Sequence, residues 1–133
     1  MSGKNAEMVR RAYEAFGRGD RETMVADIAP TFTYEATGAL PDAGAIHHGP
    51  EGWAQFVRWL SDQFEDARVE IHELVETGDQ VLASATLRGR GRKSGAETSW
   101  HVWHLWTFQE GKLVHGRGFT DRAEAWEAAG LSE

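Results

Sequence analysis

Histidine and tryptophan gather in one short stretch of this sequence, residues 98–111, which is TSWHVWHLWTFQEG. Three Trp recur at positions 100, 103 and 106, and two His stand at 101 and 104. An imidazole can donate a hydrogen bond or shuttle a proton near neutral pH, so a His in an aromatic cavity could act on a ligand. A spacing of three is typical of one side of a helix, whereas a strand divides these residues between two faces. The possible chemistry therefore depends on which element forms here.

Composition and the following turn favour a strand over residues 98–108. Trp, Val, Thr and Phe prefer strands, and Gln109-Glu110-Gly111 is predicted to be a three-residue hairpin loop with Gly in the left-handed position. The predicted pairs are Phe108 with Lys112, Trp106 with Val114, His104 with Gly116, Val102 with Gly118 and Trp100 with Thr120. One face then carries Trp100, Val102, His104, Trp106 and Phe108 opposite glycines, as a strongly bent sheet around a cavity requires. Trp103 is expected on the opposite, convex face with His101, Leu105 and Thr107.

Tyr13 and Tyr34 are two further candidate donors. Tyr13 belongs to an inward-facing stripe of a predicted helix, and Tyr34 to the inward face of a predicted strand. A Tyr hydroxyl in a cavity can stabilise a developing oxyanion. The alternative for both is core packing with a satisfied hydroxyl, and the alternative for His104 is a core imidazole bonded to the backbone.

No metal site is expected. His47 and His48 are adjacent, adjacent residues seldom chelate one ion together, and no Cys or close acidic partner completes a set. We expect these two His at the rim of a pocket. The basic residues of RGRGRKSG (88–95) could clamp an anionic ligand, but a solvated connection between strands is the favoured interpretation. Neither a Ser-His-Asp pattern nor a phosphate-binding loop is visible.

Three helices are predicted in the first half of the chain. The first carries Val9, Ala12, Tyr13 and Phe16 on one face and stops at Gly17 and Gly19. Asp20 is an N-cap for a short second helix with Met24, Val25 and Ile28, which Pro30 ends. Pro50 suits the first turn of a third helix, whose apolar stripe is Trp53, Phe56, Val57, Leu60 and Phe64.

Strands are predicted around and after the third helix. Residues 31–36 alternate as a half-buried strand, and a long loop over 37–49 is expected to be functional. The segments 68–76 and 80–88 flank a hairpin signal, TGD, and a last strand spans 112–120. A closing helix begins with the capping box Asp121-x-x-Glu124 and ends at Gly130.

Length and composition indicate one domain spanning residues 1–133. Hydrophobic residues make up 41% and charged residues 26%, which is ordinary globular composition. There are 14 Lys+Arg against 21 Asp+Glu, and the net charge of −7 argues against nucleic acid as the main partner. No Cys, no apolar N-terminal segment and no run of membrane-spanning length are present, so we expect a cytoplasmic protein without a membrane partner.

The order of these elements and four motifs resemble the SnoaL-like branch of the nuclear-transport-factor-2-like superfamily. The motifs are AYEAFGRGD (12–20), HHGPEGW (47–53), HLWTFQEGKLV (104–114) and FTDRAEAWEAAGL (119–131). The resemblance covers nearly the whole chain. It implies an α+β fold in which a cone-shaped, curved mixed β-sheet holds three helices from the N-terminal half of the chain in its concave face, with a pocket between them. It also implies homodimers through the outer sheet face, without implying one activity.

The resemblance also implies roles for particular residues. His104 falls near the position where ketosteroid isomerases, relatives in this superfamily, place a buried acidic donor. Asp121 resembles the aspartate that SnoaL-like cyclases use as a base, although Asp-x-x-Glu is also a helix cap. The isomerase base position falls on Ala36, so steroid isomerisation is not expected.

The sequence therefore predicts a pocket for a small hydrophobic molecule with carbonyl or hydroxyl groups. Catalytic candidates are His104, Asp121, Tyr34 and Tyr13, and the expected ligand-binding residues are Trp53, Phe56, Trp100, Val102 and Trp106. An enzyme of this kind would carry out acid–base cyclisation, isomerisation or dehydration without a cofactor, as polyketide cyclases do. The alternative is a non-catalytic module for ligand binding or dimerisation.

Overall fold

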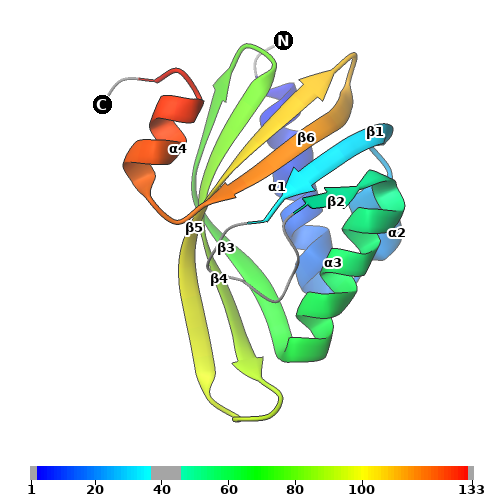
Figure 1. Ribbon diagram of the computed structural model, residues 1–133, viewed down its shortest axis with the longest axis vertical. Helices are drawn as coiled ribbons and strands as arrows, with labels where there is room; N and C mark the ends of the chain where they lie inside the picture. The colour runs from blue at the N-terminus through cyan, green and yellow to red at the C-terminus, as the bar shows by residue number, and fades with distance from the viewer. Residues whose placement is uncertain (1–2, 37–45, 132–133) are drawn as a thin grey trace.

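A curved six-stranded sheet organises this protein, and the computed structural model describes residues 3–36 and 46–131. The strands lie in the order β2-β1-β6-β5-β4-β3; β1 and β6 are parallel, and the other pairs among the described strands are antiparallel. In chain order the elements are α1 (Lys4–Arg18), α2 (Arg21–Val25), β1 (Ile28–Glu35), β2 (Ile46–His48), α3 (Gly49–Gln63), β3 (Phe64–Thr77), β4 (Gln80–Gly91), β5 (Glu97–Gln109), β6 (Lys112–Phe119) and α4 (Arg122–Ala128). Helices α1, α2 and α3 lie on one side of the sheet and α4 on the other (Figure 1). The predicted fold class, an α+β fold with a curved mixed sheet, is confirmed.

The second helix is shorter than the sequence predicts. Asp20 caps α2 by accepting a hydrogen bond from the Thr23 amide, as expected, but the helix ends at Val25. Ile28 and Pro30, predicted to finish that helix, belong to β1 instead. The β1–β6 register is irregular between Ile28 and Thr33, and Pro is tolerated in a strand where the ladder is interrupted.

The segment 37–49, predicted to be a loop, contains a short strand. Residues 46–48 form β2, which pairs antiparallel with β1 and places His47 opposite Tyr34. Gly49, the last residue of the predicted loop, begins α3, and residues 37–45 lie outside the described residues. Pro50 occupies the first turn of α3, as predicted.

The β5–β6 hairpin differs from the predicted register while keeping the predicted faces. Its connection is the two-residue turn Glu110-Gly111, with φ values of 50° and 78°, rather than a three-residue loop. The shorter turn alone would reverse every side chain, because strand side chains alternate with period two. A bulge between Thr107 and Phe108 adds one more residue and restores the faces. The observed pairs are Trp106 with Gly116 and His104 with Gly118, so the predicted pairs are wrong by two residues.

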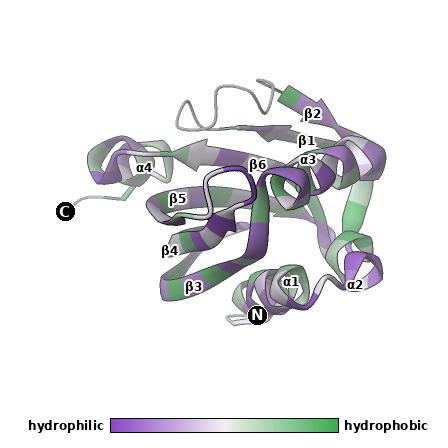
Figure 2. Ribbon diagram, turned by 90° about the horizontal axis from the view of Figure 1, so that it is seen from below, coloured by the Kyte–Doolittle hydropathy of each residue, from purple (hydrophilic) through white to green (hydrophobic). Residues whose placement is uncertain are grey.

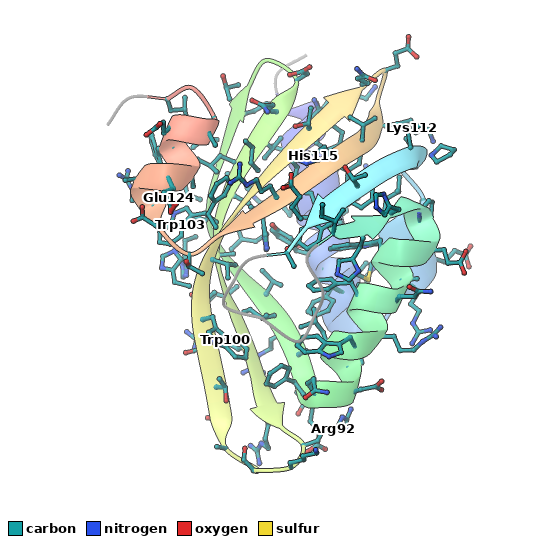
Figure 3. All side chains as sticks on the ribbon, viewed as in Figure 1. Arg92, Trp100, Trp103, Lys112, His115 and Glu124 are labelled. Atoms are coloured by element: carbon teal, nitrogen blue, oxygen red, sulfur yellow. The ribbon has the colours of Figure 1, made fainter. Side chains whose placement is uncertain are left out.

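The outer face of the sheet is partly covered by the chain itself. Leu105 and Phe119 are buried there against Ala125 of α4, and the half-buried Trp103 packs against the same cluster. Figure 3 shows Trp103 on the side of the sheet where α4 carries Glu124. Trp103 and Leu105 are on the convex face, as expected, but α4 folds over them and over Phe119, so these residues do not form an open apolar surface for a second copy of the chain.

The concave face carries the main core. Apolar and polar residues alternate along β3, as Figure 2 shows, so one side of the strand faces the helices. Phe32 and Tyr34 of β1 are almost completely buried against it, as their alternation predicted. Across residues 3–36 and 46–131, no helix has both the length and the apolar character needed to cross a membrane.

Candidate functional site

A cavity of about 360 Å³ lies between the concave face of the sheet and helices α1, α2 and α3. Its size falls within the range of small-molecule sites. Three of the four predicted catalytic residues, Tyr13, Tyr34 and His104, line it. So do four of the five predicted ligand-binding residues, Trp53, Phe56, Val102 and Trp106. The structure thus brings together residues from α1, β1, α3 and β5 that are far apart in the sequence.

A chain of hydrogen bonds joins three of these residues. The indole N–H of Trp106 donates to the hydroxyl oxygen of Tyr13 at 2.9 Å, and that hydroxyl lies 2.7 Å from Nδ1 of His104. Tyr13 is positioned by the apolar stripe of α1, and His104 and Trp106 by the alternation of β5. One helix residue therefore connects two same-face residues of a strand.

Tyr34 is packed by aromatic rings but its hydroxyl has no partner among the described residues. Its ring stacks on Trp106 with centroids 5.8 Å apart and contacts Trp53 at 5.0 Å and Phe56 at 5.1 Å. Only 2% of the residue is exposed. The rings hold the phenol in place, and no hydrogen bond occupies its oxygen.

Two polar atoms are thereby left for a ligand. Tyr34 Oη and His104 Nε2 have no hydrogen-bond partner in the described parts of the chain, yet neither is a sealed, unsatisfied atom. Both residues line the cavity, and their ring centroids are 6.2 Å apart. Both residues can therefore contact one ligand in the cavity.

Burial sets the protonation of these groups. Desolvation lowers the pKa of His104 from 6.5 to about 4, so the imidazole is neutral at pH 7. Part of the His104 surface remains accessible, and this residue lines the cavity. Burial raises the pKa of Tyr13 and of Tyr34 above the usual value of a phenol. At pH 7 these three side chains are therefore neutral, which suits an uncharged ligand oxygen.

Two predicted site residues lie elsewhere. Trp100 is outside the cavity lining and packs edge-on against Phe64 at 5.1 Å, because it stands farther along β5 toward the β4–β5 turn (Figure 3). Asp121 lies at the N-terminus of α4, on the outer side of the sheet, where its carboxylate accepts the Glu124 amide at 3.2 Å. The cap predicted for Asp121 is present, and the structure places this carboxylate away from the cavity.

The mouth of the cavity carries polar residues that sequence analysis missed. Of the lining residues, Arg11, Thr23 and Ala26 are exposed, so the opening lies between α1 and α2. Asp27 follows them and is the one acidic residue among the described lining residues. A sequence signal existed, since Asp27 stands between the inward-facing Met24 and Ile28, but the mistaken extension of the second helix hid it.

His47 lies behind the cavity wall. Its ring contacts Phe56 at 5.0 Å, and its Nε2 is buried without a partner. In the described ranges, no group of three or more His, Asp or Glu residues is arranged to hold a metal ion. In the basic connection, Arg88 and Arg90 form ion pairs with Glu70 and Glu97, consistent with the solvated interpretation.

Comparison with known proteins identifies the family of this chain. The family model described as "SnoaL-like domain" matches residues 9–116, and the chain therefore belongs to the SnoaL-like domain family. The search of curated proteins finds no match.

Similar folds occur among solved structures. An NTF2-like protein of unknown function from Burkholderia pseudomallei K96243 is 26% identical, with a TM-score of 0.81 over 96% of this chain and 97% of that one. TerC, crystallised with polyporic acid, is 20% identical with a TM-score of 0.80 over 94% and 97% of the two chains. A protein from Jannaschia sp. CCS1, assigned by resemblance to the SnoaL-like polyketide cyclases, is 22% identical with a TM-score of 0.77 over 98% and 94%. The last two show the fold alone.

Proposed function

We propose that the cavity binds a small, largely planar hydrophobic molecule through one carbonyl or hydroxyl oxygen held between Tyr34 Oη and His104 Nε2. The observation that carries this proposal is the presence of two unpartnered polar atoms, from different strands, in an otherwise aromatic cavity. Rings of Trp53, Phe56 and Trp106 supply flat apolar walls. A ligand oxygen in the cavity could accept hydrogen bonds from these two atoms, and a few placed polar groups of this kind fix the orientation of a ligand in an apolar pocket.

The chemistry that suits this site is cofactor-independent acid–base catalysis beside a carbonyl, of the cyclase, isomerase or dehydratase type. Donors aimed at a carbonyl oxygen stabilise the enolate that forms when a neighbouring proton is removed. With a pKa of about 4 and Nδ1 engaged by Tyr13, His104 is suited to polarising a ligand rather than to acting as the base. Asp27 is the candidate base, because it is the one acidic residue of the described lining.

Binding is tested by a thermal-shift screen of planar aromatic ketones, quinones and phenols, with polyporic acid included because TerC was crystallised with it. A ligand at 100 times its dissociation constant adds about 2.7 kcal/mol of stability. Tyr34→Phe should weaken the hits about tenfold by removing one hydrogen bond, whereas Asp121→Asn, outside the cavity, should leave them unchanged. Equal dissociation constants for the original protein, Tyr34→Phe and Asp121→Asn would contradict the proposed site.

Catalysis is tested separately, by following hydrogen–deuterium exchange beside the carbonyl of each hit in deuterated water by NMR. Exchange that requires Asp27, and is lost in Asp27→Asn while binding persists, supports the enzyme. A non-catalytic binding module is the second candidate, favoured by the predominantly apolar lining and the neutral histidine. Binding without exchange in the original protein would establish that alternative.

Assembly as a homodimer is a further part of the proposal. Beyond α4, the outer face carries a polar cluster in which His72 bonds to Thr86 at 2.7 Å and His101 bonds to Ser84 at 2.8 Å while stacking on Trp103. We place the contact between two copies on this cluster. Sedimentation should detect a dimer at micromolar concentration that His101→Asp weakens; a monomer would contradict it. The cytoplasmic setting remains a prediction from composition.

A further inference from the structure

The direction of the hydrogen bonds in the Trp106–Tyr13–His104 chain follows from what each group can do. An indole N–H only donates, so the Tyr13 oxygen must accept from Trp106. Tyr13 is buried, and its own O–H proton needs an acceptor. The acceptor within reach is Nδ1 of His104 at 2.7 Å, and the described residues offer the Tyr13 hydroxyl no other acceptor.

A proton on Nδ1 of His104 would leave the hydroxyl proton of Tyr13 without an acceptor. If Nδ1 of His104 carried the hydrogen, the Tyr13 oxygen would accept twice and its O–H would point at no acceptor in a buried site. An unsatisfied buried donor is strongly disfavoured. Because the imidazole carries a single proton when neutral, that proton must then reside on Nε2, the nitrogen left for the cavity.

We infer that the Trp106–Tyr13 pair holds the proton of His104 on Nε2, and that the cavity consequently selects a ketone over the alcohol of the same skeleton. This inference rests on the proposed function and narrows its ligand class. Trp106 and Tyr13 act here as positioning residues, because they determine what His104 offers without themselves holding the ligand oxygen.

The preference for a ketone follows from the number of hydrogen-bond donors and acceptors at the ligand oxygen. A ketone oxygen has two lone pairs, which accept from His104 Nε2–H and Tyr34 O–H and satisfy both donors. An alcohol brings its own O–H proton to the same place. Tyr34 Oη cannot accept that proton while it donates to the same ligand oxygen, and the protonated Nε2 of His104 has no lone pair to accept it. One buried donor is therefore left unpaired with the alcohol, which should weaken its binding by about tenfold.

The first experiment compares 9-fluorenone with 9-fluorenol, which share a planar tricyclic skeleton and differ in one carbonyl or hydroxyl group. Dissociation constants are measured by calorimetry for the original protein, Tyr13→Phe and Tyr34→Phe. We expect about tenfold tighter binding of the ketone to the original protein. Tyr13→Phe frees His104 to carry its proton on either nitrogen, so the ratio should fall toward one.

Tyr34→Phe is the matched control, because it removes one phenol oxygen from the same cavity without touching the Trp106–Tyr13–His104 chain. It should weaken the ketone yet preserve the ketone preference, since His104 still presents only a donor. Equal binding of both compounds to the original protein, or an unchanged ratio in Tyr13→Phe, overturns the inference and leaves the proposed function standing. Binding of neither compound overturns the proposed function for planar ketones, and the selectivity with it.

A second measurement needs no ligand. Proton–nitrogen correlation NMR distinguishes a protonated ring nitrogen from an unprotonated one, and the His104 signals are identified by their loss in His104→Asn. At pH 7 we expect Nε2 protonated and Nδ1 unprotonated. A proton on Nδ1 overturns the inference whether or not either compound binds.

Discussion

Gly116 of β6 leaves the space in which the indole ring of Trp106 lies across the sheet. The two residues are paired in the β5–β6 ladder, and a Cβ atom at position 116 would overlap the Trp106 ring and lie 3.0 Å from Tyr34. The absence of a side chain at this one position thus allows a large ring to form the cavity wall. Both Trp106 and Tyr34 depend on it for their position.

Gly116→Ala should therefore destabilise the protein by about 1–3 kcal/mol, as overpacking of a core does. Chemical unfolding followed by Trp fluorescence measures the loss. The matched control is Gly17→Ala in α1, where the added Cβ meets only Arg68 at an ordinary 3.8 Å. That change should be neutral or stabilising, because Ala favours a helix over Gly. Equal effects of the two substitutions would contradict the packing.

His104 should make stability depend on pH between 6.5 and about 4. In the unfolded chain the imidazole takes up a proton as pH falls through 6.5, whereas the folded protein resists protonation until about 4. The unfolded state binds more protons in that window, so stability falls with falling pH, by at most about 1.4 kcal/mol per pH unit. The free energy of unfolding of His104→Asn should lack this part of the pH dependence. The same pH dependence in the original protein and in His104→Asn would contradict the contribution of His104.

The two tyrosines of the cavity should respond oppositely to loss of their hydroxyls. Tyr13→Phe leaves the Trp106 N–H and His104 Nδ1 without partners and should cost about 1–3 kcal/mol. Tyr34→Phe removes a hydroxyl without a partner among the described residues, so stability should be unchanged or slightly increased. Urea denaturation of both variants tests the contrast. A larger loss in Tyr34→Phe would show that its hydroxyl is engaged.

Glu76 of β3 caps the first helix from a distance. One of its carboxylate oxygens accepts from the amides of Gly3 at 3.0 Å and Ala6 at 3.1 Å. Glu76→Ala should destabilise the protein by about 0.5–2 kcal/mol, as loss of an N-cap does. Glu73→Ala, an exposed position on the same strand, serves as control, and melting temperatures suffice to compare them. A similar shift in both variants would argue against the cap.

Detaching α4 should expose the apolar residues it covers. Ala125 has no exposed surface and packs with Leu105 and Phe119, so Ala125→Asp forces a carboxylate into that contact. Self-association or dye binding should increase at micromolar concentration. Ala123→Asp, exposed in the same helix, should behave like the original protein. An unchanged association state in both variants would contradict the covering role of α4.

The sequence by itself determined the faces of the strands and the helical stripes. Period-two alternation placed His104 and Trp106 on the concave face and Trp103 on the other, and the i, i+3, i+4 spacing directed Tyr13 and Phe56 inward. These are local properties, because side-chain direction follows from the backbone period. The fold class followed from the order of elements and from motifs that resemble one family.

The tertiary structure alone decided the rest. The register of the β5–β6 hairpin depended on a bulge between Thr107 and Phe108. Trp100 lies outside the cavity because of its position along β5, where it packs against Phe64. The hydrogen bonds of Tyr13 join residues 93 and 91 positions apart, and the low pKa of His104 comes from its burial beneath α1. Burial and long-range partners depend on how distant segments pack, and no local pattern of residue types specifies that packing.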